Sequence, residues 1–184
     1  MKFSLKVLLL SSLFTNLAAG LLGPLYAVYV EKIGGNLITA GTAFAILPIV
    51  SGALIFLFSK WEDRVKHQEK LLIWSRALNV AGFLGYLFIR NPTDLFLVQA
   101  VFGVSLAIGG PAFYSLYSKN LDRGKFASEW GVLESVCLMT IGIAAIVGGY
   151  VAEDFGFRTL FFLMFIISIL SFIISLFLLK KNKK

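Results

Sequence analysis

Ionisable side chains are rare within the long apolar stretches of this 184-residue sequence, and the two that occur there, Arg76 and Glu134, could do chemistry. A charge near the centre of a bilayer costs roughly 2.5 to 3.5 kcal/mol on insertion scales, so a glutamate there should face water or a partner and can exchange a proton. Glu134 is therefore a candidate for proton coupling, and a structural ion pair with Arg76, at similar depth, is the alternative. The long Arg76 side chain also favours extension to the membrane surface.

Two stripes of small and polar residues predict a path for a solute. The first has steps of four, four, three and four residues, one face of a helix: Ser12, Asn16, Gly20, Gly23 and Ala27. The second lies at an offset of 87 residues: Gln99, Gly103, Ala107, Gly110 and Tyr114. Such residues gain by facing protein or water. The pathway candidates are Asn16, Tyr26, Gln99 and Tyr114, and close helix packing without a pathway is the alternative. Apart from Glu134 no charge is evident here, which favours neutral, amphipathic or weakly cationic solutes.

Catalysis and metal binding are not indicated. Cys137 is the only cysteine and His67 the only histidine, so the sequence lacks a Cys-based metal site, and no nucleophile has a base beside it. We predict no catalytic residue, no metal and no cofactor. The net charge of +7 comes from short loops without interleaved aromatics, so nucleic-acid binding is not expected.

Six apolar stretches must position these residues. Hydrocarbon about 30 Å thick needs roughly 20 apolar residues in a helix. The stretches cover about 7–30, 38–59, 71–89, 95–118, 130–152 and 159–179. A hydrophobic content of 58% and a mean hydropathy of +0.85 exceed the roughly 45 to 50% apolar content of soluble domains. The sequence therefore predicts an all-α, polytopic protein with six transmembrane helices in a single domain over residues 1–184, with the lipid bilayer as its partner.

The basic residues favour one side of this predicted membrane protein. Thirteen of the 17 Lys and Arg residues precede the first stretch, follow the last, or lie in the second-to-third and fourth-to-fifth loops. The opposite loops hold only Lys32, Arg90 and Arg158. The positive-inside rule then places both termini in the cytoplasm of a multi-pass protein of the plasma or inner membrane. Residues 1–19 could pass for a signal peptide, but the apolar run continues to Val30 and is interpreted as the first crossing.

An internal repeat links the two halves of the chain. The segment GLLGPLY at 20–26 is echoed by AIGGPAF at 107–113, which divides the sequence into units of about 1–90 and 91–184. Because each unit holds three crossings, the second runs in the opposite sense, which predicts a 3+3 inverted repeat. Chance matching of Gly and Pro in apolar sequence is the alternative.

Each repeat unit carries one Gly-Pro pair, Gly23-Pro24 and Gly110-Pro111. Proline removes a helical hydrogen bond and glycine lets the backbone bend. The two pairs are therefore candidate outer and inner gate hinges. A static kink is the alternative.

Several segments resemble motifs of the major facilitator superfamily. The loop at 59–68 keeps the Asp63-Arg64 pair of the family's loop motif without its glycines, and Gln99 to Gly103 is similar to an Arg-x-x-x-Gly motif with Gln in place of Arg. Gly131 and Gly148-Gly149 resemble the family's antiporter motif, although Ala144-Ala145 stands where that motif has Gly-Pro. The segment at 154–158 is similar to the family's Gly-Trp-Arg turn. The whole chain resembles one six-helix, N-terminal-like half of such a transporter.

The resemblance implies a secondary transporter of small solutes rather than an enzyme, working by alternating access. Family members have twelve helices, so one half encloses no pathway. Both halves start in the cytoplasm, and we expect a parallel homodimer, since twofold pairing is the commonest oligomer symmetry. Pairing with a second, different half is the near alternative to the homodimer. A non-transporting membrane scaffold or regulator, or a fragment of a longer transporter, is the alternative.

Overall fold

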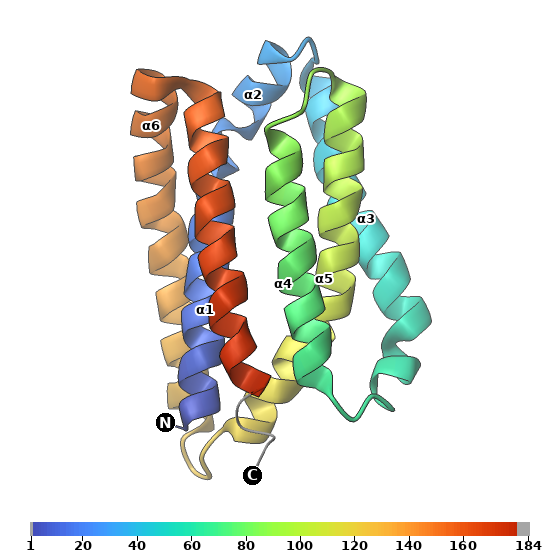
Figure 1. The fold of residues 1–184 in the computed structure, drawn as a ribbon, viewed down its shortest axis with the longest axis vertical. Helices are drawn as coiled ribbons and strands as arrows, with labels where there is room; N and C mark the ends of the chain where they lie inside the picture. Colours follow the sequence, from blue (N-terminus) through green and yellow to red (C-terminus); the bar gives the residue numbers. More distant parts are fainter. Residues whose placement is uncertain (1, 180–184) are drawn as a thin grey trace.

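The structure, a computed structural model, describes residues 2–179 and is built from helices, with no strand among those residues. Figure 1 shows them as an elongated bundle. The elements are α1 (Phe3–Gly20), the short 3-10 helix η1 (Gly23–Leu25), α2 (Tyr26–Lys32), α3 (Leu37–Glu62), α4 (Gln68–Tyr86), α5 (Pro92–Asn120) and α6 (Phe126–Leu176). The all-helical class predicted from the sequence is confirmed.

Within residues 2–179, four helical segments are long and apolar enough to cross a membrane: Phe3–Lys32, Leu37–Glu62, Pro92–Asn120 and Phe126–Leu179. The sequence predicted six separate crossings. Helix α4 falls short of the apolar requirement because it carries Glu69, Lys70 and Arg76. The last segment counts once although it reverses direction. Six crossings in a 3+3 arrangement therefore stay a prediction.

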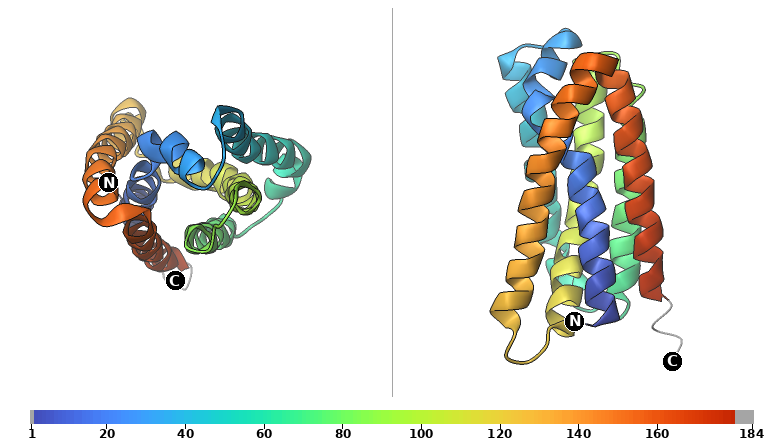
Figure 2. Two further views of the ribbon diagram at one scale, coloured as in Figure 1. Left: turned by 90° about the horizontal axis from the view of Figure 1, so that it is seen from above. Right: turned by 90° about the vertical axis from the view of Figure 1, so that its left-hand side faces the viewer.

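The reversal of α6 occurs at Gly156, which has a φ of 80° and a ψ of 166°. Only glycine adopts this region without strain because a Cβ would collide with the backbone. The first limb of α6 (126–155) and the second limb (157–176) therefore run in opposite directions from this turn (Figures 1 and 2). The turn lies where the sequence predicted a boundary between two crossings.

The helices associate in two groups. Helix α1 packs mainly against α6, whereas α5 packs mainly against α3 and α4, and contacts between α1 and α5 are few. Serines of the second limb join it to α1, as Ser171 Oγ donates to the Ser11 carbonyl at 2.8 Å and bonds Thr15 Oγ1 at 2.8 Å. Helix α4 also contacts α6 and so joins the groups. The sparse α1–α5 contact leaves space between them.

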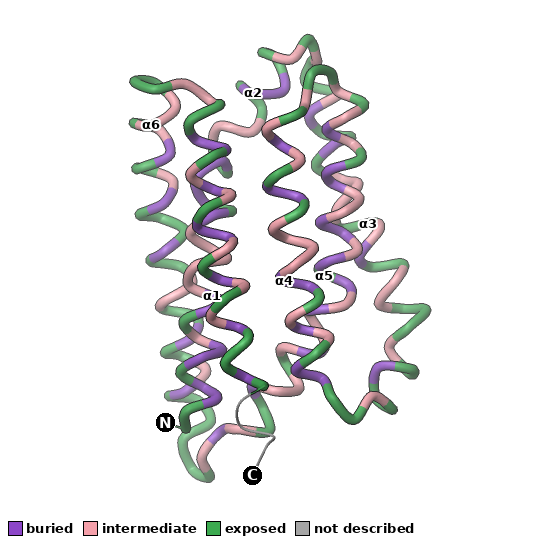
Figure 3. Tube along the Cα trace, viewed as in Figure 1, coloured by how far each residue is buried: buried purple, intermediate pink, exposed green. Residues whose placement is uncertain are grey.

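Large apolar side chains cover the outside of the bundle. Phe56 on α3 is 85% exposed, and Ile38 on α3 is 79% exposed. Figure 3 shows long exposed runs on α3 and on the first limb of α6. Soluble proteins rarely expose apolar patches of this size, so these faces suit lipid or a partner protein.

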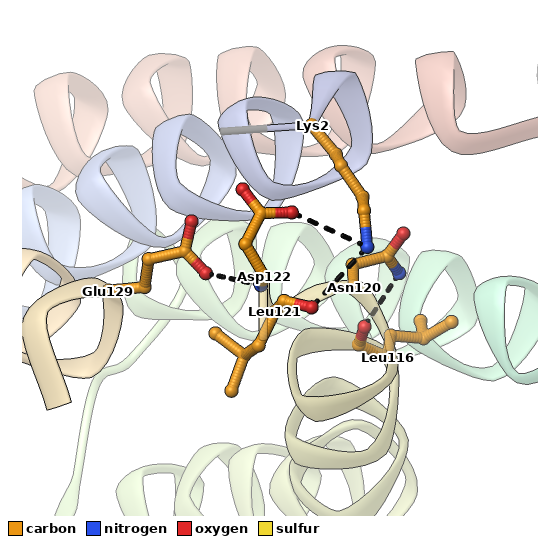
Figure 4. Close-up of polar contacts among 6 residues, drawn as sticks. All are labelled: Lys2, Leu116, Asn120, Leu121, Asp122 and Glu129. Carbon is orange, nitrogen blue, oxygen red and sulfur yellow. Dashed lines mark hydrogen bonds and ion pairs between the residues drawn. The ribbon is translucent and has the colours of Figure 1, made fainter. Parts of the chain in front are cut away.

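Polar contacts close one end of the bundle, where α1 begins, α6 ends and the α5–α6 loop lies (Figures 1 and 4). Lys2 Nζ donates to the Leu121 carbonyl at 3.3 Å and lies 3.6 Å from Asp122 Oδ1. The Asp122 backbone N–H donates to Glu129 Oε2 at 2.9 Å, and Tyr117 Oη donates to the Glu129 carbonyl at 2.6 Å. The start of α1 is thereby tied to the loop between α5 and α6, at 121–125.

Candidate solute cavity

The space between α1 and α5 is a cavity of about 600 Å³. Its walls come from α1, η1, α3, α4 and α5, with Tyr26 from α2 and Met164 from the second limb of α6. Cavities of roughly 300 to 1,000 Å³ accept drug-sized ligands. Phe44 and Tyr114 line it and are still 68% and 59% exposed, so the cavity is open to the outside next to these two residues.

All four pathway candidates, Asn16, Tyr26, Gln99 and Tyr114, line this cavity. Gln99 is buried, and its Nε2 donates to Tyr26 Oη at 2.7 Å and to Tyr86 Oη at 3.5 Å. This polar group joins α2, α4 and α5. Whether these residues contact a solute stays a prediction.

The predicted stripes are only partly directed at the cavity. Ser12, Gly23 and Gly110 line it, whereas Gly20 and Gly103 pack against neighbouring helices. A Cβ on Gly20 would lie 2.9 Å from Ala144 Cβ, and one on Gly103 would lie 2.8 Å from Val50 Cβ. Close packing and cavity lining thus alternate along the same helices.

Arg76 and Glu134 differ from expectation. Arg76 is only 9% exposed and lines the cavity, so the expected extension to the membrane surface is wrong. Glu134 is exposed on the first limb of α6 and is not among the cavity residues. Among the ion pairs of residues 2–179, none joins the two. Arg76 lies on the face of α4 that lines the cavity, which holds its side chain away from the surface.

Sequence reasoning missed the contribution of α4 to the cavity. Arg76, Asn79, Phe83 and Tyr86 line it at steps of three, four and three residues, one face of a helix. That spacing was visible in the sequence. The path was predicted only on the two helices that carry the repeated Gly-Pro segments, and α4 carries no such segment.

The candidate hinges and the loop motif lie in different settings. The backbone leaves the α-helix at Leu21 and Leu22, and Pro24 lies within η1, whereas α5 continues through Pro111. The two candidate hinges therefore differ in backbone conformation, and their role in gating stays a prediction. Asp63 and Arg64 are exposed in the turn between α3 and α4. Within residues 2–179 no group of three or more His, Cys, Asp or Glu residues could hold a metal ion.

An apolar outer surface and a mainly apolar cavity with a few polar side chains, between two helix groups, define a class: helical membrane proteins that can admit a small solute. Residues 8–184 match the family model described as Major Facilitator Superfamily, so the chain belongs to that superfamily. This confirms the resemblance found in the sequence. Members of the family are transporters rather than enzymes.

Relatives of the chain include proteins named multidrug resistance protein MdtG. The chain is 24% identical to the one from Dickeya zeae, 25% to that of Klebsiella pneumoniae and 27% to that of Proteus mirabilis, in each case over 98% of its own length. It covers 45%, 45% and 46% of those proteins. The chain thus spans about half the length of the curated relatives it matches.

Proposed function

We propose that this chain is one six-helix half of a transporter that moves small, amphipathic solutes across the membrane by alternating access. The observation that carries the proposal is the cavity between α1 and α5, lined by residues of both repeat units. The name of the relatives, multidrug resistance protein, favours amphipathic drugs as substrates. The apolar cavity walls favour the same class of solute.

The six crossings would be α1 with α2, then α3, α4, α5 and the two limbs of α6. Opposite directions of α1 and α5 support the inverted repeat (Figure 1). The start of α1, the end of α6, and the loops at 63–67 and 121–125 lie at one end, which supports cytoplasmic termini. In a Cys137→Ser background, labelling of Lys66→Cys from the cytoplasm and of Arg90→Cys from outside would be expected. Labelling of both from one side would contradict the topology.

A second half is needed to close the cavity, because Phe44 and Tyr114 are largely exposed at its opening. The partner is a second copy in parallel orientation or a different six-helix half. Photobleaching of single labelled particles in lipid should give two-step traces for the homodimer. Uniform one-step traces for the chain alone would contradict the homodimer.

Transport itself is tested in proteoliposomes with a panel of fluorescent amphiphiles. Tyr114→Ala, in the cavity, should reduce uptake several-fold, whereas Tyr150→Ala, 70% exposed on the first limb of α6, should not. Equal effects would contradict a role of the cavity in transport. A chain that moves no solute, alone or with a second half, would favour the membrane scaffold or regulator.

Gating would use the Gly23-Pro24 break and the Gly110-Pro111 site as outer and inner flexures. Unchanged uptake by both Pro24→Ala and Pro111→Ala would contradict this part of the proposal.

Glu134 is the candidate for proton coupling, although it is exposed and is not among the cavity residues in this conformation. Glu134→Gln should abolish the dependence of uptake on a pH gradient. Uptake that kept this dependence would exclude the role.

A further inference from the structure

The cavity holds a buried cation without a partner. Arg76 is 91% buried, since only 9% of its surface is exposed, and its Nε has no hydrogen-bond partner. Arginine stays charged under all conditions relevant to proteins. A buried charge with no counter-charge is strongly unfavourable, and an ionisable group within a membrane is by default a sign of a functional site.

A structural role for Arg76 would require groups that satisfy it. No ion pair or hydrogen bond of residues 2–179 involves this guanidinium. The neighbouring Ser75 is already paired, because its Oγ lies 3.1 Å from Ser105 Oγ and its carbonyl accepts from Ser105 at 2.7 Å. The polar atoms of Ser75 are thus committed to Ser105.

We propose that Arg76 is an anion-binding residue of the cavity, and that the solute is an amphipathic anion whose carboxylate, sulfonate or phosphate group docks on the guanidinium. This inference rests on the proposed transport function and replaces the neutral or cationic solutes that the sequence favoured. The planar guanidinium offers donors in a fork that matches two oxygens of such a group.

The rest of the cavity matches the apolar body of such a molecule. Among the cavity residues that the structure describes, Arg76 is the charged one, and much of the wall is aromatic: Phe44, Phe83, Phe102 and Phe113. Asn79 lies one turn from Arg76, and Tyr86 lies ten residues beyond it, about 15 Å along the helix axis at 1.5 Å per residue. An elongated ligand would place its anionic end at Arg76 and its other end near the Tyr26–Gln99–Tyr86 group.

The test compares dansyl amphiphiles with one alkyl body and three head groups: carboxylate, primary amide and trimethylammonium. Binding to the purified full chain in phosphatidylcholine nanodiscs is measured by equilibrium dialysis. We expect the carboxylate to bind about tenfold or more tightly than the other two, which is within the strength of a charge-assisted hydrogen bond. Arg76→Gln should lose this preference while keeping its affinity for the amide.

Two further variants separate anion binding from misfolding. Arg76→Lys should keep part of the preference because it retains the charge but not the fork. Arg90→Gln removes one positive charge from an exposed site outside the cavity and should bind like the wild type. Equal affinity for carboxylate and ammonium, or a preference that survives in Arg76→Gln, would overturn the proposal.

A further arm identifies the source of the anion. Adding phosphatidylglycerol to the nanodiscs should displace the carboxylate probe if the site accepts lipid headgroups, and should leave binding unchanged if it accepts only freely diffusing amphiphiles. Binding is measured without transport, so the anion preference can hold even if uptake fails. Conversely, uptake of cations unaffected by Arg76→Gln would leave the transporter standing and remove the anion site.

Discussion

The two Gly-Pro sites have similar sequences, but the helix is broken at one site and continuous at the other. At Gly23-Pro24 the helix breaks, and Pro24 occupies one of the first positions of η1, where its missing N–H is not needed. At Gly110-Pro111 the helix α5 runs on from Pro92 to Asn120, although Pro111 cannot donate to the carbonyl four residues earlier.

The neighbours account for this difference. The Leu21 carbonyl at the break lies against Gly148 of the first limb of α6, where a side chain would overlap it. Helix α5 instead lies along α3 and α4, and Gly109 is so close to Ser75 that a Cβ would overlap the serine Oγ. A Gly-Pro pair permits a break, and packing on adjacent helices decides whether one forms.

The largest effect is expected from Gly148→Ala, because the added methyl group would meet backbone atoms of Leu21 that cannot rotate away. Overpacking of this kind destabilises by about 1 to 3 kcal/mol. Thermal unfolding in nonionic detergent, followed by tryptophan fluorescence, measures it. The control is Gly149→Ala, which has no atom within 4 Å of the new Cβ and should leave the Tm nearly unchanged. Equal shifts for both variants would show that the break does not depend on this contact.

A smaller loss of stability is expected from Gly109→Ala, next to the Gly110-Pro111 site, where helix α5 is unbroken. Here the obstacles are Oγ and Cβ of Ser75 rather than backbone atoms. Rotation of the serine would move only Oγ, with loss of its contact with Ser105 Oγ, and Cβ at 2.5 Å would still require α4 and α5 to shift slightly apart. We expect about 1 to 2 kcal/mol of destabilisation in the same unfolding assay. Gly110→Ala is the control, since its nearest atom would be Leu106 Cδ1 at 3.7 Å. A Gly109→Ala protein as stable as this control would mean that α5 is not held by α4 here.

The proline variants should also distinguish the two sites, but by a gain of stability rather than a loss. Pro111→Ala restores a donor inside α5 and should stabilise the protein by about 1 kcal/mol. Pro24→Ala should change stability by less than about 0.5 kcal/mol because the proline N–H is not needed at the start of η1. Chemical unfolding in mixed micelles gives both values. Equal gains at the two sites would contradict the difference in backbone structure.

The smallest expected effect concerns the hydrogen bond between Gln99 and Tyr26, which links the broken helix segment to α5. A double-mutant cycle with Gln99→Leu and Tyr26→Phe should give a coupling of about 0.6 kcal/mol, typical of polar contacts within membranes. The cycle with Tyr86→Phe should give less, because that contact is 3.5 Å long. A larger coupling for Tyr86 would place the functional hydrogen bond within the α4–α5 pair.

Helical class and much of the cavity lining could be predicted because each depends on short-range pattern. Apolar runs of about 20 residues require helices, and amide residues such as Asn16 and Gln99 avoid lipid. The position of Arg76 could not be predicted, because depth in the membrane permits either extension to the surface or burial. The choice depends on which helices flank α4.

The sequence alone determined the helical, apolar character of the chain, the bias of its charges, its family motifs and the four polar residues that lie at the cavity. Only the tertiary structure decided which Gly-Pro pair breaks, that Arg76 rather than Glu134 enters the cavity, and that Tyr86 joins Gln99 there. The physical reason is that these outcomes depend on contacts between helices far apart in the chain. Periodicity defines a face of a helix, but only packing determines what that face meets.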